Sequence, residues 1–177
     1  WVFCGVVMWG VVVSAPILAG QQSETSVLRA QEAAATVSAD TIAVIVFSNI
    51  TAAAEDEWVG AGIAETLAVD LAGDGALSVV GREKVSGALE NLSSGRDSGV
   101  EATEAIEVRL GRRLGARWIV SGAYQRLGDR LRITARVVEV ASAAVMHTAK
   151  VDGLMTELFA LQDRLSADLR RGLPGGA

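Results

Sequence analysis

The sequence predicts an α/β fold: a mixed β-sheet of about five strands with flanking helices, preceded by one hydrophobic transmembrane or signal segment. Three observations lead to this prediction. Residues 115–140 alternate between apolar and polar side chains on both sides of a Gly128-Asp129 turn. Residues 41–47 form a continuous, largely β-branched run, and several apolar stripes recur at helical spacing.

The first half of the domain is expected to alternate strands and helices. Residues 41–47, TIAVIVF, are typical of a strand covered on both faces. After a loop, a helix is predicted from about Glu57, with Asp56 available as its cap and Gly73 near its end. The apolar face of that helix would carry Val59, Ile63, Leu67 and Leu71. A second strand, a second helix and a flexible loop are expected over residues 77–80, 82–92 and 93–99.

The second half is expected to contain a helix, a three-stranded meander and a last helix. The first of these helices, striped by Ile106, Leu110 and Leu114, should end at Gly115, a suitable C-terminal cap. On the second hairpin strand, one face is apolar (Leu131, Ile133, Ala135, Val137) and the other is polar (Arg130, Arg132, Thr134, Arg136). This alternation describes a sheet with one packed side and one wet side. A third strand is expected around residues 144–151, and the last helix would bury Leu154, Leu158, Leu161, Leu165 and Leu169.

Length, charge and cysteine content limit the function. The 177 residues allow one domain with accessory segments, and aromatic residues make up only 5%, so the core should be built from small aliphatic side chains. The formal charge is −5, and basic residues in the C-terminal half are interleaved with acidic ones, which argues against nucleic-acid binding. Cys4 is the single cysteine, so neither an internal disulfide nor a cysteine-based metal site can form.

Residues 1–20 carry no charge and are long enough to cross a bilayer. Three interpretations are open: a transmembrane anchor, a secretory signal peptide, or a buried core helix. Gln21 stands where a lipoprotein would need its cysteine, so lipidation at that position is excluded. Residues 21–40 are expected to be a linker, and their acidic excess places this flank on the extracytoplasmic side of a membrane. The globular domain would then span residues 41–172.

Residues with catalytic or metal-binding chemistry are few, and no catalytic, cofactor-binding or metal-binding residues are predicted. His147 is the only histidine and is expected to be packed or at the surface, beside Val145 and Ala149. The glycines at Gly60 and Gly62 fit only part of a dinucleotide-binding motif, and close packing of a helix on the sheet explains them better. The acidic run over residues 55–57 is interpreted as the start of a helix.

The candidate interaction site is the arginine stripe Arg130, Arg132 and Arg136, which could meet an anionic ligand or protein partner. The other interpretation is a solvated strand face. Because this face is expected to be wet, substituting Arg132 or Arg136 by alanine should change stability only slightly. Substituting Ile133 or Leu161, on the packed side, by alanine should cost about 2–5 kcal/mol.

An ordered set of short segments resembles the TolB amino-terminal-like domain over roughly residues 41–172. The segments are IAVIVFSN (42–49), GIAETL (62–67), VVGR (79–82), LGAR (114–117), SGAYQR (121–126), ITAR (133–136) and FALQD (159–163). Two positions depart from that family: Val46 replaces its frequent proline, and Ser142-Ala143 replaces its usual Thr-Gly turn.

The resemblance implies a non-enzymatic, envelope-facing interaction or sensory module. In that family the domain often follows a membrane segment in bacterial multidomain proteins with Ser/Thr kinase, cyclase, DNA-binding or tetratricopeptide-repeat regions. It implies a protein partner, no cofactor, and an inner-membrane location through residues 1–20 with the domain in the periplasm. Homo-oligomerisation, as in an envelope-assembly component of the curli-secretion kind, is one alternative. A nucleotide- or sugar-binding enzyme domain is the other.

Overall fold

A computed structural model describes residues 40–73, 75–94 and 104–173, which belong to one compact unit within residues 37–177. The expected transmembrane or signal segment (1–20) and the linker (21–40), apart from Asp40, lie outside these described residues. Within the described part of the chain, no helix is long and apolar enough to cross a membrane.

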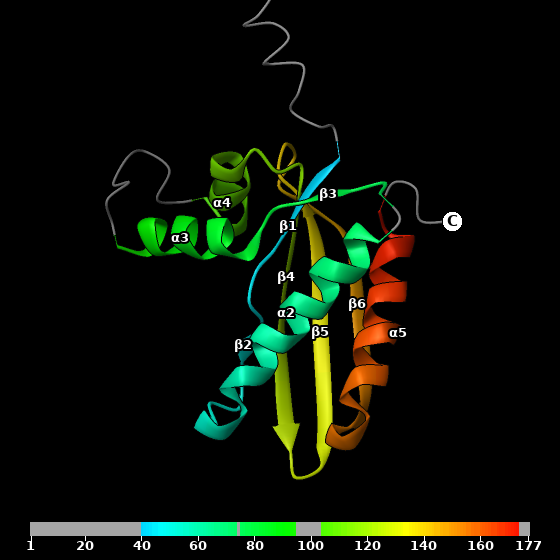
Figure 1. Cartoon of the computed structure of the whole chain (residues 1–177). Helices are drawn as coiled ribbons and strands as arrows, with labels where there is room; N and C mark the ends of the chain where they lie inside the picture. The colour runs from blue at the N-terminus through cyan, green and yellow to red at the C-terminus, as the bar shows by residue number, and fades with distance from the viewer. Residues whose placement is uncertain (1–39, 74, 95–103, 174–177) are drawn as a thin grey trace, which may run out of the picture. The chain divides into compact units, whose positions relative to one another are not determined.

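The centre of this unit is a six-stranded mixed sheet (Figure 1). Its strands are β1 (Thr41–Val44), β2 (Ser48–Asn49), β3 (Ser78–Val79), β4 (Trp118–Leu127), β5 (Arg130–Glu139) and β6 (Ala144–Leu154). The order is β3-β1-β4-β5-β6, and β2 also pairs with β4. The pairs made by β1 and β2 are parallel, whereas β4, β5 and β6 form an antiparallel meander. The predicted mixed sheet is therefore confirmed.

The strand expected over 41–47 is shorter than predicted: β1 ends at Val44, and the short strand β2 begins only at Ser48. The N–H of Ile45 still binds the carbonyl oxygen of Val120 in β4 at 2.9 Å. The next inward residue, Phe47, instead donates its N–H to the carbonyl oxygen of Gly60 in a helix, at 3.3 Å. A side chain at Gly60 would overlap the backbone carbonyl group of Phe47. Close packing is therefore the role of Gly60, as predicted, and it explains the break in the strand.

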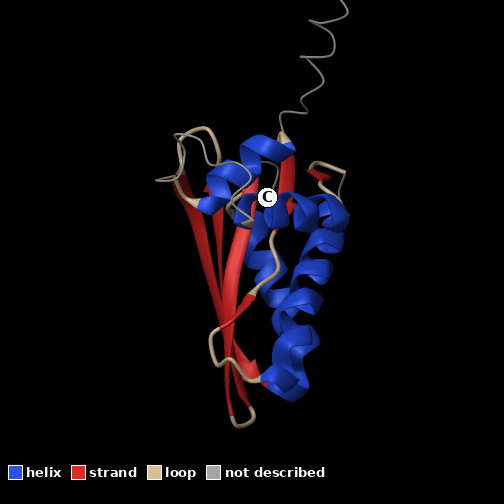
Figure 2. Cartoon of the chain, turned by 90° about the vertical axis from the view of Figure 1, so that its left-hand side faces the viewer, coloured by secondary structure: helices blue, strands red, loops and turns tan. Residues whose placement is uncertain are grey.

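In the part of the chain that the structure describes, four α-helices pack on the sheet: α2 (Glu57–Ala72), α3 (Arg82–Ser93), α4 (Ile106–Leu114) and α5 (Leu158–Arg171). Short 3-10 helices, Ala54–Asp56 and Met155–Glu157, precede α2 and α5. Helices α2 and α5 cover one face of the sheet, and α3 and α4 pack on the other face near the start of β4 (Figures 1 and 2). In the described residues, no helix covers that second face at the end where the β4–β5 hairpin turns.

The two helical layers create two hydrophobic cores. The larger core lies under α2 and α5 and contains Leu131, Ile133 and Val137 together with Leu158, Leu161 and Leu165. The smaller core lies under α3 and α4 and contains Ala43, Ile119, Val138 and Val140. The prediction that the hairpin and the last helix share one core is confirmed, and β1 is covered on both faces as expected.

Turn and cap positions follow the sequence closely. Gly115 ends α4 in a left-handed conformation, with φ of 63°. Gly128 in the hairpin turn also has a positive φ, 58°, which glycine adopts without strain. Both positions were predicted.

Two predicted helix faces were wrong in part. The buried side of α4 carries Val108 and Leu110, whereas Ile106 is 37% exposed. The helix is rotated because it approaches the sheet through Gly111, where any side chain would overlap Val140. Leu154 does not belong to the last helix: it ends β6 and is 43% exposed, because a 3-10 turn separates it from α5.

Candidate functional site

The candidate site lies on the face of the β4–β5–β6 meander that α2 and α5 do not cover. On this face, we call the area between the β4–β5 hairpin and α4 the open face. The strand register builds it from four cross-strand rows: Leu127–Arg130–Leu154, Gln125–Arg132–Asp152, Ala123–Thr134–Lys150 and Ser121–Arg136–Thr148. All three predicted arginines lie on this face, because residues two apart on a strand point the same way.

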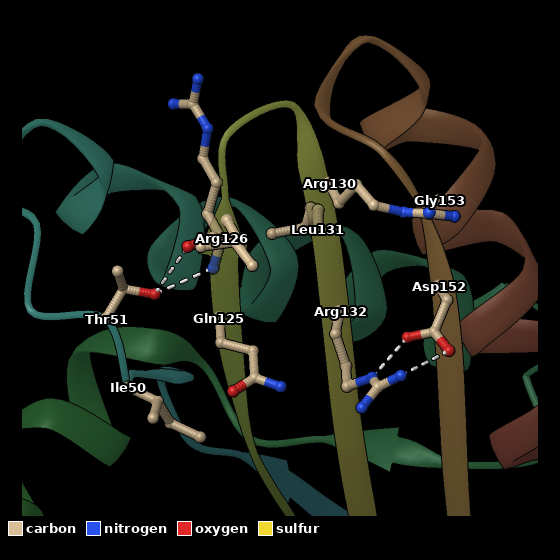
Figure 3. Close-up of a pocket in the computed structure, with 10 residues that line it drawn as sticks. Ile50, Thr51, Gln125, Arg126, Arg130, Leu131, Arg132, Asp152 and Gly153 are labelled. Atoms are coloured by element: carbon tan, nitrogen blue, oxygen red, sulfur yellow. Dashed lines mark hydrogen bonds and ion pairs between the residues drawn. The ribbon is translucent and has the colours of Figure 1, made fainter.

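Arg132 and Asp152 are direct cross-strand neighbours and form a two-pronged ion pair (Figure 3). The Nε and Nη2 atoms of Arg132 donate to the two carboxylate oxygens of Asp152 at 2.6 and 3.1 Å. This hydrogen bonding lowers the pKa of Asp152 below its ordinary value. Both side chains remain about half exposed, so the pair fixes the direction of the guanidinium group without burying it.

Arg136 is held differently, by a buried carboxylate from α4. Its Nη2 donates to Glu107, and its Nε donates to Ser121 Oγ at 3.1 Å. Ser121 Oγ in turn lies 3.3 Å from the same Glu107 oxygen. Burial raises the pKa of Glu107, but hydrogen bonds from its own backbone N–H, Arg136 and Ser121 outweigh it, and the pKa of Glu107 lies below its ordinary value. Arg136 therefore anchors α4 to the sheet.

Arg130 makes no ion pair among the described residues, although it lies close enough to contribute to the lowered pKa of Asp152. It lines a pocket of about 680 Å³ at the hairpin end of the open face. Ile50 and Thr51 close one side of this pocket, where the Thr51 hydroxyl accepts a hydrogen bond from the N–H of Arg126 at 2.9 Å (Figure 3).

A second hollow, of about 730 Å³, lies at the α4 end of the open face. Small residues line it where β4 and β5 cross the face, with Arg136 and Glu107 at its charged part. Its apolar lining includes three of the large hydrophobic side chains that the fold leaves exposed: Val46, Ile106 and Val145. The volume falls within the range of known ligand pockets, about 300–1,000 Å³. The open face thus combines fixed positive charge with uncovered apolar surface.

The acidic run over residues 55–57 lies at the start of α2, as predicted, but the expected cap by the Asp56 side chain is wrong. The Asp56 side chain makes no capping hydrogen bond. Its carboxylate accepts from Arg126 Nη1 at 2.7 Å, and its backbone oxygen accepts from the Tyr124 hydroxyl at 2.6 Å. The start of α2 is therefore tied to β4 by a buried acid.

His147 lies against α5, as a packed residue. Its Nε2 is 3.4 Å from Asp168 Oδ1, which also accepts from Arg171 at 2.6 Å. The hydrogen bond from Arg171, and to a smaller extent that with His147, lowers the pKa of Asp168. The expected neighbour Val145 is on the other side of the sheet, because a register shift places Met146 between the two paired positions.

Sequence reasoning found the arginines but missed their partners. Asp152 could have been found from the register of the meander, which sets it opposite Arg132. Glu107 gave no such signal, because it comes from a separate helix. The described residues contain no group of three or more histidine, cysteine or acidic side chains that could hold a metal ion.

Comparisons with known proteins place the fold. No family model matches the sequence. A protein of Rhizobium meliloti (strain 1021) named "Putative adenylate cyclase 3" is 25% identical over 132 residues, which are 75% of this chain and 20% of that protein. The chain therefore spans about a fifth of the length of this relative.

Two solved structures share the fold at low sequence identity. The LpoB C-terminal domain from Salmonella enterica has a TM-score of 0.50 and 18% identity, over 66% of this chain and 84% of that one. TolB from Acinetobacter baumannii has a TM-score of 0.51 and 12% identity, over 77% of this chain and 28% of that one. The fold of this chain is thus similar to folds found in LpoB and TolB.

Proposed function

We propose that this chain is a non-enzymatic interaction module of a larger bacterial membrane protein, and that it binds a protein partner on the open face. The observation that carries this proposal is the half-covered sheet. The open face keeps a set of cationic side chains, with one hollow at its hairpin end and a second hollow at its α4 end.

The partner's chemistry follows from the charges and surfaces of this face. Four cationic side chains lie in its rows, Arg130, Arg132, Arg136 and Lys150, against the two acids Asp152 and Glu107. The excess is positive, and apolar side chains line the second hollow. A partner segment with acidic residues beside a branched apolar side chain fits both features.

The larger context is part of the proposal. The chain spans only 20% of its cyclase-named relative, which supports a role as one domain of a signalling protein with a kinase or cyclase region. Residues 1–20 would anchor it in the inner membrane, and the acidic flank that follows supports a periplasmic domain.

The two alternatives have less support. A nucleotide- or sugar-binding enzyme would need a reactive set, and His147 and Gly60 are already engaged in packing within the fold. An oligomeric envelope-assembly component would need copies of this chain to meet on the open face, and the positive excess of that face would repel a second copy of itself. The open face supports the interaction module most directly.

Site-specific photo-crosslinking tests the proposal in cells. A photoreactive residue at Ala123, in the second hollow, should crosslink the whole chain to a discrete partner. The same residue at Val69, exposed on α2, should not. Arg130→Glu should reduce the Ala123 crosslink at least about tenfold, since charge reversal costs on the order of 1.4 kcal/mol or more at an interface.

The matched control is Arg164→Glu, an equal charge change on the exposed side of α5. It should leave the crosslink unchanged. Equal labelling from Ala123 and Val69, or an Arg130→Glu variant that crosslinks like wild type, would remove the open face as the binding surface.

Membrane orientation needs its own measurement. Protease added outside intact spheroplasts should degrade the domain (residues 37–177) while a cytoplasmic marker survives. After carbonate washing, the chain should stay with the membranes. Protection of the domain until the cells are lysed would place it in the cytoplasm and contradict the proposed topology.

A further inference from the structure

The outer edge of β6 is the longest strand edge without a pairing strand in the described residues. β6 has 11 residues and is the last strand in the sheet order, with β5 on its only paired side. Such an edge presents unpaired N–H and C=O groups that can pair with another strand. At the opposite edge of the sheet, β3 has only 2 residues.

The geometry of the β4–β5 hairpin determines which residues of β6 direct their backbone N–H and C=O groups away from β5. A two-residue turn makes Leu127 and Arg130 the closing hydrogen-bonded pair. Hydrogen-bonded and non-bonded pairs then alternate across the meander. The N–H and C=O groups of Thr148, Lys150 and Asp152 therefore point away from β5. Leu154, in the same alternation, donates its N–H to the Glu157 carboxylate at 3.1 Å, as this assignment requires.

The side chains on this edge are self-complementary in one register. Lys150 and Asp152 are both exposed and both lie on the open face, two residues apart. If β6 meets a second β6 in antiparallel register centred on Val151, each Lys150 faces the Asp152 of the other copy. Centring the pair on Lys150 or on Asp152 instead would set like charges opposite one another.

We propose that β6 pairs with the β6 of a second copy of this chain, antiparallel and centred on Val151, so that the two sheets become one. A lysine in an edge strand and a bulge usually discourage pairing, and here Met146 is the bulged residue. The cost of placing Lys150 at the edge is offset in this register because two Lys150–Asp152 pairs form. The proposal does not depend on the partner of the open face.

A charge-swap experiment tests the register. The compact unit (residues 37–177) holds every residue of both hydrophobic cores and is used beside the whole chain in detergent. Sedimentation should show a dimer for wild type. Lys150→Asp and Asp152→Lys should each give monomers, because like charges then face one another, and an equimolar mixture of the two variants should give a heterodimer.

The control is Lys84→Asp, at the other lysine of the chain, which is exposed on α3 and should leave the dimer intact. Thermal melting checks that each variant is folded. A Val151→Cys variant of the compact unit, which has no other cysteine, should form a disulfide-linked dimer on mild oxidation. A monomeric wild type, or single charge variants that remain dimers, would overturn the proposal, whatever the crosslinking at Ala123 shows.

Discussion

The two ends of one sheet face differ in burial, although the same two strands, β4 and β5, form both: one end is core and the other is surface. Near the start of β4, Ile119 is fully buried, and Val138 on β5 is 5% exposed, beneath α3 and α4. Near the hairpin, Gln125 and Arg132 occupy equivalent positions on the same strands and are exposed. A strand's own alternation therefore decides which side chains share a face. Whether that face becomes core or surface is decided by segments from elsewhere in the chain.

Helix length explains where the change occurs. α4 has 9 residues and is about 14 Å long at 1.5 Å per residue. β5 has 10 residues and extends about 33 Å. Whatever its direction, a helix of that length cannot cover the whole face, so the rows nearer the hairpin stay open.

The largest expected effects come from substitutions in the two cores. Ile133→Ala and Leu161→Ala in the larger core, and Ile119→Ala in the smaller core, should each lower the free energy of unfolding by about 2–5 kcal/mol, since each deletes a fully buried side chain. Gln125→Ala, at the open end of the strand that carries Ile119, should change it by no more than about 0.5 kcal/mol. Urea denaturation of the four variants measures the contrast. If Ile119→Ala were as mild as Gln125→Ala, the smaller core would contribute little.

The sequence predicted the alternation of β4 and β5 correctly, because that pattern depends only on neighbouring residues. The sequence could not predict where along β4 and β5 the helices stop covering this face. That position depends on Gly111 and on how closely α4 approaches Val140. For the same reason Arg132 and Arg136 looked equivalent as a sequence pattern. Only the position of α4 shows that one of them holds a buried acid.

Arg136→Ala should have an intermediate effect, larger than the slight one expected from the sequence. It removes the ion-pair partner of Glu107, a carboxylate that is 7% exposed, and leaves that charge with fewer hydrogen bonds. A loss of about 1–3 kcal/mol is expected. The double variant Arg136→Ala with Glu107→Gln should be less destabilised than the sum of its parts, because no buried charge is then left unpaired. An additive result would show that the pair is not coupled.

The stability of the chain at acidic pH should depend on the ionisation of Glu107. The pKa of Glu107 is lower in the folded state than its ordinary value of 4.5, so its contribution is fully present above about pH 4.5. The contribution is lost as the pH falls through the lowered folded-state pKa. The melting-temperature difference between wild type and Glu107→Gln should therefore shrink on acidification below about pH 4.5. A constant difference across that range would mean that Glu107 does not titrate with a lowered pKa.

Arg132→Ala should have a smaller effect on stability than Arg136→Ala. The comparison distinguishes an arginine that serves the surface from one that anchors α4 to the sheet. Arg132 and Asp152 are both about half exposed, so water can replace the lost hydrogen bonds on either side. The melting temperature should therefore shift less than in Arg136→Ala, and the small shift should fade further in high salt, which screens exposed charges. Binding of the open-face partner should nevertheless weaken, because the cationic face loses one positive charge and Asp152 loses the arginine that neutralises it within the same row. Arg132→Lys is the matched control: it keeps the charge but loses the two-pronged geometry, and should bind at an intermediate level. If Arg132→Ala melted as early as Arg136→Ala, the open end of the face would be as structural as the covered end, and the distinction between them would fail.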